Sequence, residues 1–326
     1  MPVILLLWLL LLACLVVAAD RLAWARAALL SLLLLALSAW WLVDRISGDG
    51  INAATLYHLQ AGLEGAGVAG FSADLWRFGG LVLLSLAPLV LAAVRGRLPR
   101  LRGRRAAAGV SAAFAAAFVA AIVASPLHHD VLRLQRQLAP ADGRSVATEY
   151  RPPSGTLERP KNIVWIYGES LERTYLDQDA FPGLMPELAR LVAQGLDFRD
   201  VASPQGTGWT IAGIVASMCG VPLTAARGDE NSLGRMREFL PGARCLPEFL
   251  AEQGYRNVFL GGADSNFAAK GRFLRQHGFH EVRDRDHYLA TGIDPAHFSH
   301  WGLHDDVLLE DAFDTFMELS ATGQPF

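Results

Sequence analysis

Four long apolar runs occupy the first part of this chain and constrain what it can fold into. They span residues 2–19, 25–43, 78–94 and 106–125. The hydrocarbon core of a bilayer is about 30 Å thick, and roughly 17–25 helical residues cross it. The runs therefore predict an α-helical membrane domain with four transmembrane helices, over residues 1–125. The first run has no basic residue ahead of it and a second span follows at once, so we interpret it as a retained helix rather than a signal peptide.

Composition separates this part from the rest of the chain. The 326 residues are 52% hydrophobic and 19% charged, whereas about 25% of residues are charged in a typical soluble protein. Because the apolar excess lies almost entirely in the first 125 residues, it excludes disorder, a fibrous protein and a purely soluble enzyme. The net charge of −3 gives no general affinity for nucleic acid. The membrane is therefore the expected partner of this half, and nucleic acid is not.

Positive charges indicate how the spans are oriented. Six arginines lie between the third and fourth runs, namely Arg95, Arg97, Arg100, Arg102, Arg104 and Arg105. Short loops rich in arginine stay on the cytoplasmic side of a membrane, so everything after residue 125 is expected on the outer face. In a Gram-negative bacterium this describes a multi-pass inner-membrane protein whose second half lies in the periplasm.

Residues 126–160 connect the two halves. Leu127, Val131, Leu134 and Leu138 recur at spacings of four, three and four residues. This spacing predicts an amphipathic helix that lies on the membrane or on the following domain. Several prolines and a glycine come next, so the remainder is expected to be a linker.

From residue 161 to residue 326, short β-branched runs alternate with helical patterns. The expected strands are 162–167, 196–201 and 257–260, and the expected helices are 186–195, 210–219, 246–253, 268–277 and 306–319. Strands that alternate with helices predict an α/β domain with a mainly parallel sheet. Ligands in such domains bind at the carboxyl ends of the strands.

Two of these element ends carry residues suited to chemistry. Glu169 follows the first expected strand, where a carboxylate either binds a hard cation such as Mg²⁺ or Mn²⁺ or caps a helix. Thr210 begins a helix after a glycine-bearing loop, where free N–H groups attract a phosphate or sulfate. Metal coordination would lower the pKa of such a hydroxyl enough for nucleophilic attack. Simple N-capping by Thr210 is the alternative, and Thr207 competes as the nucleophile.

Three separated blocks resemble one protein family. They are Asn162–Tyr175 (NIVWIYGESLERTY), Gly208–Gly213 (GWTIAG) and Trp301–Asp306 (WGLHDD). Together with the four-span anchor, these blocks are similar to the phosphoglycerol transferases that decorate osmoregulated periplasmic glucans. That family belongs to the alkaline-phosphatase and sulfatase superfamily, which includes the lipoteichoic acid synthases. The resemblance covers nearly the whole chain and implies that residues 161–326 are the N-terminal part of a sulfatase-like catalytic domain.

The resemblance also implies roles for three residues. Glu169 falls on the family's metal-ligating glutamate, and Thr210 falls on its threonine, which is both nucleophile and metal ligand. Lys270 is similar in position to a basic residue that holds the substrate phosphate in the lipoteichoic acid synthases, where arginine stands instead. A neighbouring substrate-contacting tryptophan of those synthases would fall on Ala268, so that contact is absent or different here. The implied cofactor is a divalent metal ion, Mn²⁺ or Mg²⁺.

The implied reaction has two steps. Thr210 attacks the phosphorus of phosphatidylglycerol, and diacylglycerol leaves. A sugar hydroxyl of a periplasmic glucan then takes the phosphoglycerol group from the threonine. The same fold with another substrate is the first alternative: a phosphoethanolamine transferase, a lipoteichoic-type polymerase or a sulfatase. The sulfatase version is the weakest, because the Cys/Ser-x-Pro-x-Arg block of those enzymes is missing.

One part of the superfamily pattern is not found. Members complete their metal site with a late Asp-His pair, and this sequence ends at Phe326 before such a block. The local candidates to substitute, which we interpret as structural or substrate-facing, are Asp305, Asp306, His300 and His304. The expected catalytic domain is therefore truncated and incomplete. The second alternative is a non-catalytic membrane protein that still binds glucan or lipid.

Two cysteines lie in the second half of the chain. Cys219 and Cys245 are 26 positions apart. The periplasm is oxidising, so they either form a disulfide or remain two buried thiols.

Overall fold

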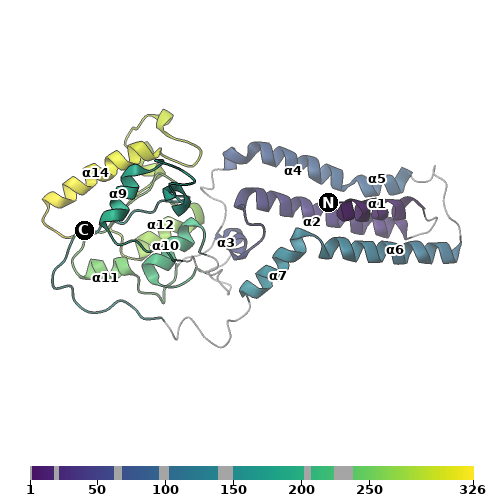
Figure 1. The fold of residues 1–326 in the computed structure, drawn as a ribbon, viewed down its shortest axis with the longest axis horizontal. Helices are drawn as coiled ribbons and strands as arrows, with labels where there is room; N and C mark the ends of the chain where they lie inside the picture. Colours follow the sequence, from purple (N-terminus) through teal and green to yellow (C-terminus); the bar gives the residue numbers. More distant parts are fainter. Residues whose placement is uncertain are drawn as a thin grey trace. The chain divides into compact units, whose positions relative to one another are not determined.

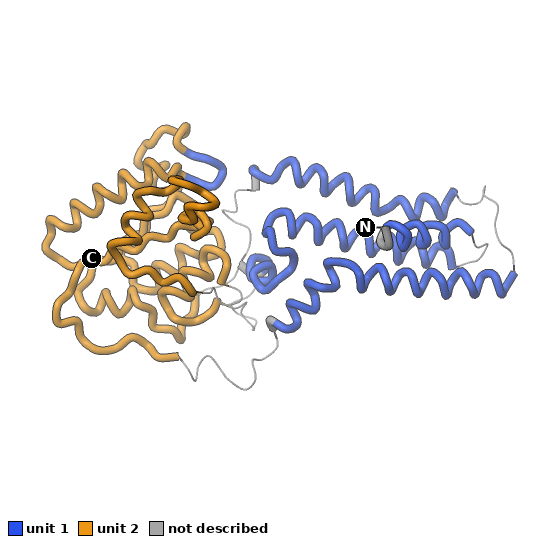
Figure 2. The backbone as a smooth tube through the Cα atoms, in the orientation of Figure 1, with its two compact units in different colours: residues 1–144, 224–236, 298–302 blue, residues 145–223, 237–297, 303–326 orange. Residues whose placement is uncertain are grey.

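The computed structural model describes residues 2–17, 22–61, 68–94, 103–138, 150–201, 207–223 and 238–326. The chain divides into two compact units, which Figure 2 shows in different colours. The first unit comprises residues 1–144 with the segments 224–236 and 298–302, and the second comprises residues 145–223, 237–297 and 303–326.

The first unit is helical throughout its described elements (Figure 1). Its elements are α1 (Pro2–Val17), α2 (Ala23–Ser47), α3 (Ala53–Ala61), η1 (Val68–Phe71), α4 (Ser72–Ser85), α5 (Ala87–Val94), α6 (Arg104–Val123) and α7 (Pro126–Leu138). Helices α4 and α5 are separated at Leu86, two residues before Pro88. Proline has no N–H group and its ring clashes with the carbonyl four residues earlier, so it interrupts a helix at this place.

Three helical stretches are long and apolar enough to cross a membrane. They are Ala23–Ser47, Ser72–Val94 and Arg104–Val123, and they contain the second, third and fourth predicted spans or nearly all of them. The first predicted span forms helix α1, whose 16 described residues are fewer than the roughly 20 that a bilayer core requires. Residues 18 and 19 of that span lie outside the described residues, so a membrane helix over residues 2–19 stays a prediction.

Small and branched side chains form the core between these helices. The buried residues are Leu11, Cys14, Leu15, Ala27, Leu30, Leu33, Ala92, Phe114, Ala117 and Ala121. They come from α1, α2, α5 and α6, and alanines allow helices in a membrane to approach closely. Most leucines of α1 and α4 point outward and are exposed, as expected for a surface in contact with lipid.

Helix α7 is the predicted amphipathic helix, and one carboxylate joins it to α2. Asp130 Oδ2 accepts hydrogen bonds from Trp40 Nε1 over 2.7 Å and from Ile51 N–H over 2.9 Å. Arg133, one turn further along α7, donates to the other oxygen of Asp130 over 3.0 Å. The first four arginines of the predicted cytoplasmic loop and residues 139–149 of the predicted linker lie outside the described residues.

The second unit mixes helices with short strands. Its elements are η3 (Arg173–Leu176), α9 (Pro186–Gln194), α10 (Thr210–Cys219), α11 (Leu246–Glu252), β1 (Val258–Leu260), η4 (Phe267–Ala269), α12 (Lys270–Gln276), β2 (Glu281–Arg283), α13 (Arg285–Ala290), η5 (Pro295–His297) and α14 (Asp305–Ala321). The five predicted helices are confirmed within a few residues, although the one predicted at 268–277 is divided into η4 and α12.

The described sheet is smaller than the one the sequence predicts. It has two strands, β1 and β2, which run parallel and pair Val258 with Glu281 and Leu260 with Arg283. The parallel arrangement is confirmed. Strand β2 carries charged residues at both ends, so it lacked the apolar pattern on which the prediction relied.

The predicted strands 162–167 and 196–201 are wrong for the described structure. Residues 162–167 follow an irregular path, and the backbone bond they make to a distant residue runs from Ile163 N–H to the Phe326 carbonyl over 2.7 Å. Their side chains are exposed rather than buried, as are Leu196 and Phe198 in the other segment. The β-branched composition favours a strand, but a strand forms only where a neighbouring backbone completes its ladder.

Candidate active site

A tight turn presents Glu169 to solvent. The Leu171 N–H donates to the Gly168 carbonyl over 3.2 Å, so the chain reverses here. Ser170 has a positive φ of 62°, a conformation that costs an L-residue on the order of 1–3 kcal/mol. The next helical turn, η3, begins only after Glu172, which occupies its N-cap position. Helix capping by Glu169, the alternative from the sequence, is therefore wrong.

Helix α10 has Thr210 as its first helical residue. Its N-cap position is occupied by Trp209, which is extended with φ −143° and ψ 156°, so Thr210 does not cap the helix. The Gly213 N–H donates to the Trp209 carbonyl over 2.9 Å. The N–H groups of the residues between them have no partner inside a helix. Such helix N-termini bind phosphate groups.

The side chains of Thr210 and Glu169 contact each other directly. Thr210 Oγ1 lies 2.7 Å from Glu169 Oε1 and 2.8 Å from Oε2. Because an ionised carboxylate only accepts, the threonine hydroxyl donates its proton to the two oxygens. Both residues are exposed, so a ligand can reach these oxygen atoms. The fold thus brings together two residues that the sequence separates by 41 positions.

Accessibility favours Thr210 over Thr207 as the nucleophile. Thr207 is 7% exposed, so its hydroxyl lies beneath the surface that an incoming phosphate would meet. The loop before it, residues 202–206, lies outside the described residues.

An unusual backbone leads to Lys270, the first residue of α12. Ala268 and Ala269 both have positive φ angles, 54° and 59°. Residues with a Cβ atom rarely adopt this conformation, and here two adopt it in succession. Strained backbone gathers at functional sites because the surrounding fold must hold it in place. Ser170 beside Glu169 shows the same feature, so strain lies next to two of the three residues that the sequence singled out.

The Lys270 ammonium is buried near several carboxylates. The residue is 7% exposed, and burial lowers the pKa of its side chain, while the charges of Asp284, Glu169 and Asp264 oppose that shift. Its Nζ also lies 5.9 Å from the ring centre of Phe259. The attraction to Glu169 places this cation in the electrostatic neighbourhood of the Thr210–Glu169 contact.

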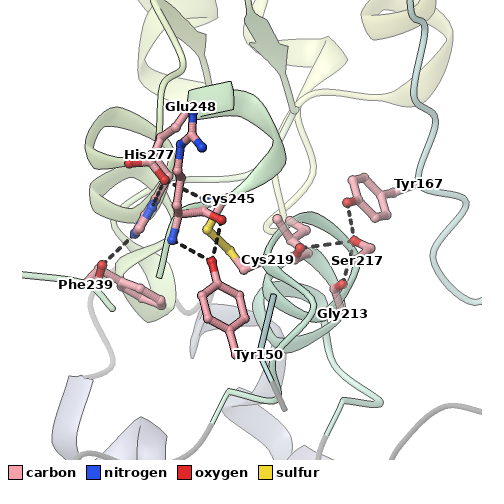
Figure 3. Close-up of a disulfide and its surroundings, with 11 residues drawn as sticks. Tyr150, Tyr167, Gly213, Ser217, Cys219, Phe239, Cys245, Glu248 and His277 are labelled. Atoms are coloured by element: carbon pink, nitrogen blue, oxygen red, sulfur yellow. Dashed lines mark hydrogen bonds and ion pairs between the residues drawn. A yellow bond between two sulfur atoms is a disulfide. The ribbon is translucent and has the colours of Figure 1, made fainter. Parts of the chain in front are cut away.

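A second cluster of potential metal ligands lies at the C-terminal end of α10 (Figure 3). One ligand atom each from Cys245, Glu248 and His277 lies within 4.8 Å of the others. However, the structure joins Cys245 to Cys219 in a disulfide, so this sulfur is not a thiolate that could bind a metal. Glu248 Oε2 accepts a hydrogen bond from the Cys245 N–H over 2.7 Å and completes a capping box for α11.

Both ring nitrogens of His277 are also engaged. Nδ1 lies 2.8 Å from Glu248 Oε2, and Nε2 lies 2.6 Å from the Phe239 carbonyl oxygen. A carbonyl only accepts, so Nε2 carries a proton and has no lone pair for a metal. We therefore assign this cluster a structural role, because its three groups are all partnered within the protein.

The oxygen atoms of Glu169 and Thr210 fit a hard divalent cation. Carboxylate and hydroxyl oxygens are the donors that Mg²⁺ and Mn²⁺ prefer. Such ions take about six ligands, so water, substrate or further residues would have to complete the set. Among the described residues, no group of three potential His, Cys, Asp or Glu ligands includes Glu169. This holds for the four local candidates from the sequence, Asp305, Asp306, His300 and His304.

One contact beside the site was missed by sequence reasoning. The hydroxyl groups of Tyr167 and Ser217 lie 2.6 Å apart. Tyr167 precedes Glu169 by two residues, and Ser217 lies on the same helix as Thr210. A helical spacing of seven residues between Thr210 and Ser217 is the signal that could have suggested a shared face.

Two family models match the chain. The model described as phosphoglycerol transferase I, N-terminal domain, matches residues 1–145. The model described as sulfatase matches residues 161–326, which is just over half of the chain. No solved structure matches the chain.

Curated relatives are similar over nearly the whole chain. Phosphoglycerol transferase I of Xanthomonas campestris pv. campestris is 58% identical over 323 residues, which are 99% of this chain and 45% of the relative. The protein of that name from Xanthomonas euvesicatoria pv. vesicatoria is 59% identical over 318 residues, 98% of this chain and 45% of the relative. One from Escherichia coli O6:H1 is 39% identical over 284 residues, 87% of this chain and 36% of the relative.

The chain spans less than half the length of these relatives. The sulfatase model nevertheless covers the whole of the second predicted half, including Glu169, Thr210 and Lys270. The chain therefore belongs to the sulfatase family, and its residues 1–145, ahead of that domain, match the model of the phosphoglycerol transferase I N-terminal domain.

Proposed function

We propose that this chain carries a phosphoglycerol-transfer site in which Thr210 is the nucleophile. The observation that carries the proposal is the contact between Thr210 Oγ1 and both oxygens of Glu169, at 2.7 and 2.8 Å. An exposed hydroxyl that donates its proton to a carboxylate at a helix N-terminus combines a nucleophile with a site for a phosphate group. The name phosphoglycerol transferase I of the relatives supports the group transferred.

The first step forms a covalent intermediate on the protein. The donor is phosphatidylglycerol. A bond forms between Thr210 Oγ1 and phosphorus, and the bond from phosphorus to the diacylglycerol oxygen breaks. The threonine proton passes along its hydrogen bond to Glu169 and from there to the departing diacylglycerol oxygen. The free N–H groups at the start of α10 face the phosphate oxygens. Lys270 holds the phosphate through its positive charge, which burial makes more effective by reducing screening by water.

The second step returns the threonine to its initial state. A hydroxyl of a periplasmic glucan attacks phosphorus, the bond between phosphorus and Thr210 Oγ1 breaks, and the proton of the glucan hydroxyl passes by way of Glu169 to Thr210 Oγ1. Sulfatase-family domains are generally metal-dependent, and Glu169 and Thr210 would hold Mn²⁺ or Mg²⁺. When bound, such an ion lowers the pKa of the attacking hydroxyl and stabilises charge on the phosphate.

The same proposal includes the location of the site. Residues 1–125 form a multi-pass anchor in the bacterial inner membrane, residues 126–160 connect it, and residues 161–326 contain the catalytic residues in the periplasm. The three apolar helical stretches support the anchor. A disulfide between Cys219 and Cys245 is consistent with an oxidising compartment.

Trapping the intermediate tests this function. The chain is incubated with Mn²⁺ and vesicles of phosphatidylglycerol without a sugar acceptor, and its peptides are examined by mass spectrometry. We expect phosphoglycerol on Thr210, and none in the Thr210→Ala variant. Thr207→Val is the matched control and should keep the modification. Modification that persists in Thr210→Ala, or that moves to Thr207, would contradict the proposal. Vesicles of phosphatidylethanolamine test the alternative donor.

A further inference from the structure

The segment that carries Glu169 contacts helix α10 at two places. Glu169 contacts Thr210 at the beginning of the helix. Tyr167 contacts Ser217 near its end, where the two hydroxyl oxygens lie 2.6 Å apart (Figure 3). Thr210 and Ser217 are seven residues apart, close to two helical turns, so they lie on one face of the helix. The chain from Tyr167 to Glu169 thus runs toward the helix N-terminus along that face.

The direction of the second hydrogen bond follows from the other partners of Ser217. Its Oγ lies 2.8 Å from the Gly213 carbonyl oxygen and 3.0 Å from that of Ile214. A serine hydroxyl has one proton, and carbonyl oxygens only accept. The serine proton is therefore directed to the helix backbone, and Tyr167 donates to Ser217.

We propose that Tyr167 and Ser217 are positioning residues that hold the Glu169 carboxylate against the Thr210 hydroxyl; this inference rests on the proposed function. One contact would let the segment pivot on the helix, whereas two contacts define both its place and its direction. The segment needs such support, because residues 162–167 form no strand and Ser170 has a strained φ of 62°. The hydrogen bond from Tyr167 to Ser217 thereby fixes the position of this segment, which in a sheet would be fixed by hydrogen bonds to a neighbouring strand.

The first test measures binding of Mn²⁺ alone to the 326-residue chain in detergent. Tyr167→Phe removes the hydroxyl and keeps the ring. We expect a three- to tenfold weaker affinity, because a hydrogen bond contributes a modest net free energy. Ser217→Ala should weaken binding equally, and the double variant should be no weaker than either single one. Ser217→Thr, which keeps a hydroxyl, should restore the affinity. Tyr175→Phe is the matched control, since it removes a phenol hydroxyl from a ring that contacts Phe181.

The second test is hydrogen exchange without metal. The Leu171 N–H, which donates to Gly168 within the turn that presents Glu169, should exchange faster in Tyr167→Phe and in Ser217→Ala than in Tyr175→Phe. Unchanged exchange would overturn the inference. Faster exchange with unchanged Mn²⁺ affinity would also overturn it, because the contact would then be structural only. If the unvaried chain binds no Mn²⁺, the metal part of the proposed function fails, and the exchange result alone decides the inference.

Discussion

The two ends of helix α10 present similar chemical groups in opposite environments. At its N-terminal end, Thr210 and Glu169 are both exposed and share one proton. At its C-terminal end, Cys219 is joined to Cys245, and His277 is 3% exposed between two acceptors. A carboxylate takes part in each place. The residue types at the two ends are similar. What separates a site that can bind a ligand from one that holds the fold together is whether its polar groups are exposed and whether other protein groups already occupy them.

The largest expected change in unfolding free energy concerns the disulfide at the C-terminal end of α10. Replacing Cys219 and Cys245 together by alanine should lower the free energy of unfolding by about 3.5 kcal/mol, the loop-entropy value for a bridge between residues 26 apart. Denaturant titration measures this change. The Mn²⁺ affinity of the folded variant should stay within about twofold of the unvaried chain, because the bridge does not touch the other end of the helix. If the double variant lost little unfolding free energy but much of its Mn²⁺ affinity, the disulfide end of α10 would serve binding rather than stability, contrary to this assignment.

His277 should show the next largest effect. His277→Ala leaves the Phe239 carbonyl without its side-chain partner and removes one of the two hydrogen bonds that Glu248 Oε2 accepts, which should cost about 2–3 kcal/mol of unfolding free energy. Thermal unfolding of the folded domain provides the measurement. His304→Ala, at an exposed position, is the control and should change stability by less than about 0.5 kcal/mol. Equal effects of the two variants would remove the structural role assigned to the cluster.

Lys270 should give a smaller, pH-dependent effect. Its pKa in the folded chain is lowered by burial from the ordinary value of 10.5, so the unfolded chain binds more protons between the two values. Stability therefore rises with pH across that interval. Lys270→Met should remove this rise, which denaturant titrations at several alkaline pH values would detect. A rise of the same size in Lys270→Met would show that another group causes it.

The smallest expected change in stability is at the N-terminal end of α10, where Thr210 and Glu169 are exposed. Thr210→Ala and Glu169→Gln should each alter the unfolding free energy by less than about 0.5 kcal/mol, because both side chains lie at the surface. Each should nevertheless abolish the modification expected with phosphatidylglycerol. Loss of stability as large as that of His277→Ala would mean that these residues serve the fold instead.

Local patterns predicted the helices and one strand, 257–260, which forms β1 (Val258–Leu260), but they failed for the other two predicted strands. Helix α10 begins at Thr210 and ends at Cys219, as its sequence indicates, because its apolar residues and the glycine that follows Cys219 are local features. Residues 162–167 have strand composition yet form none, since a strand also needs a neighbour that a local pattern cannot identify. The prediction missed β2 because its charged ends give no apolar pattern.

The candidate site was predictable in part. The position of Glu169 after an apolar run, the position of Thr210 at a helix start, and the family resemblance together singled out two residues that prove to be in contact. The contact of Tyr167 with Ser217, 50 positions apart, and the partners of His277 depend on how distant segments pack. The seven-residue spacing indicates that Thr210 and Ser217 share a face of α10, but no local pattern identifies the distant partners Tyr167, Glu248 and Phe239.

Calorimetric titration of Mn²⁺ into Glu169→Gln and Glu248→Gln, beside the unvaried chain, tests the central claim most directly. Both variants replace a carboxylate by its neutral amide, one at each end of α10. The account predicts that Glu169→Gln loses at least tenfold in affinity, while Glu248→Gln keeps its affinity and loses stability instead. Loss of Mn²⁺ binding in Glu248→Gln with none in Glu169→Gln would contradict the account and move the metal site to the buried end of the helix.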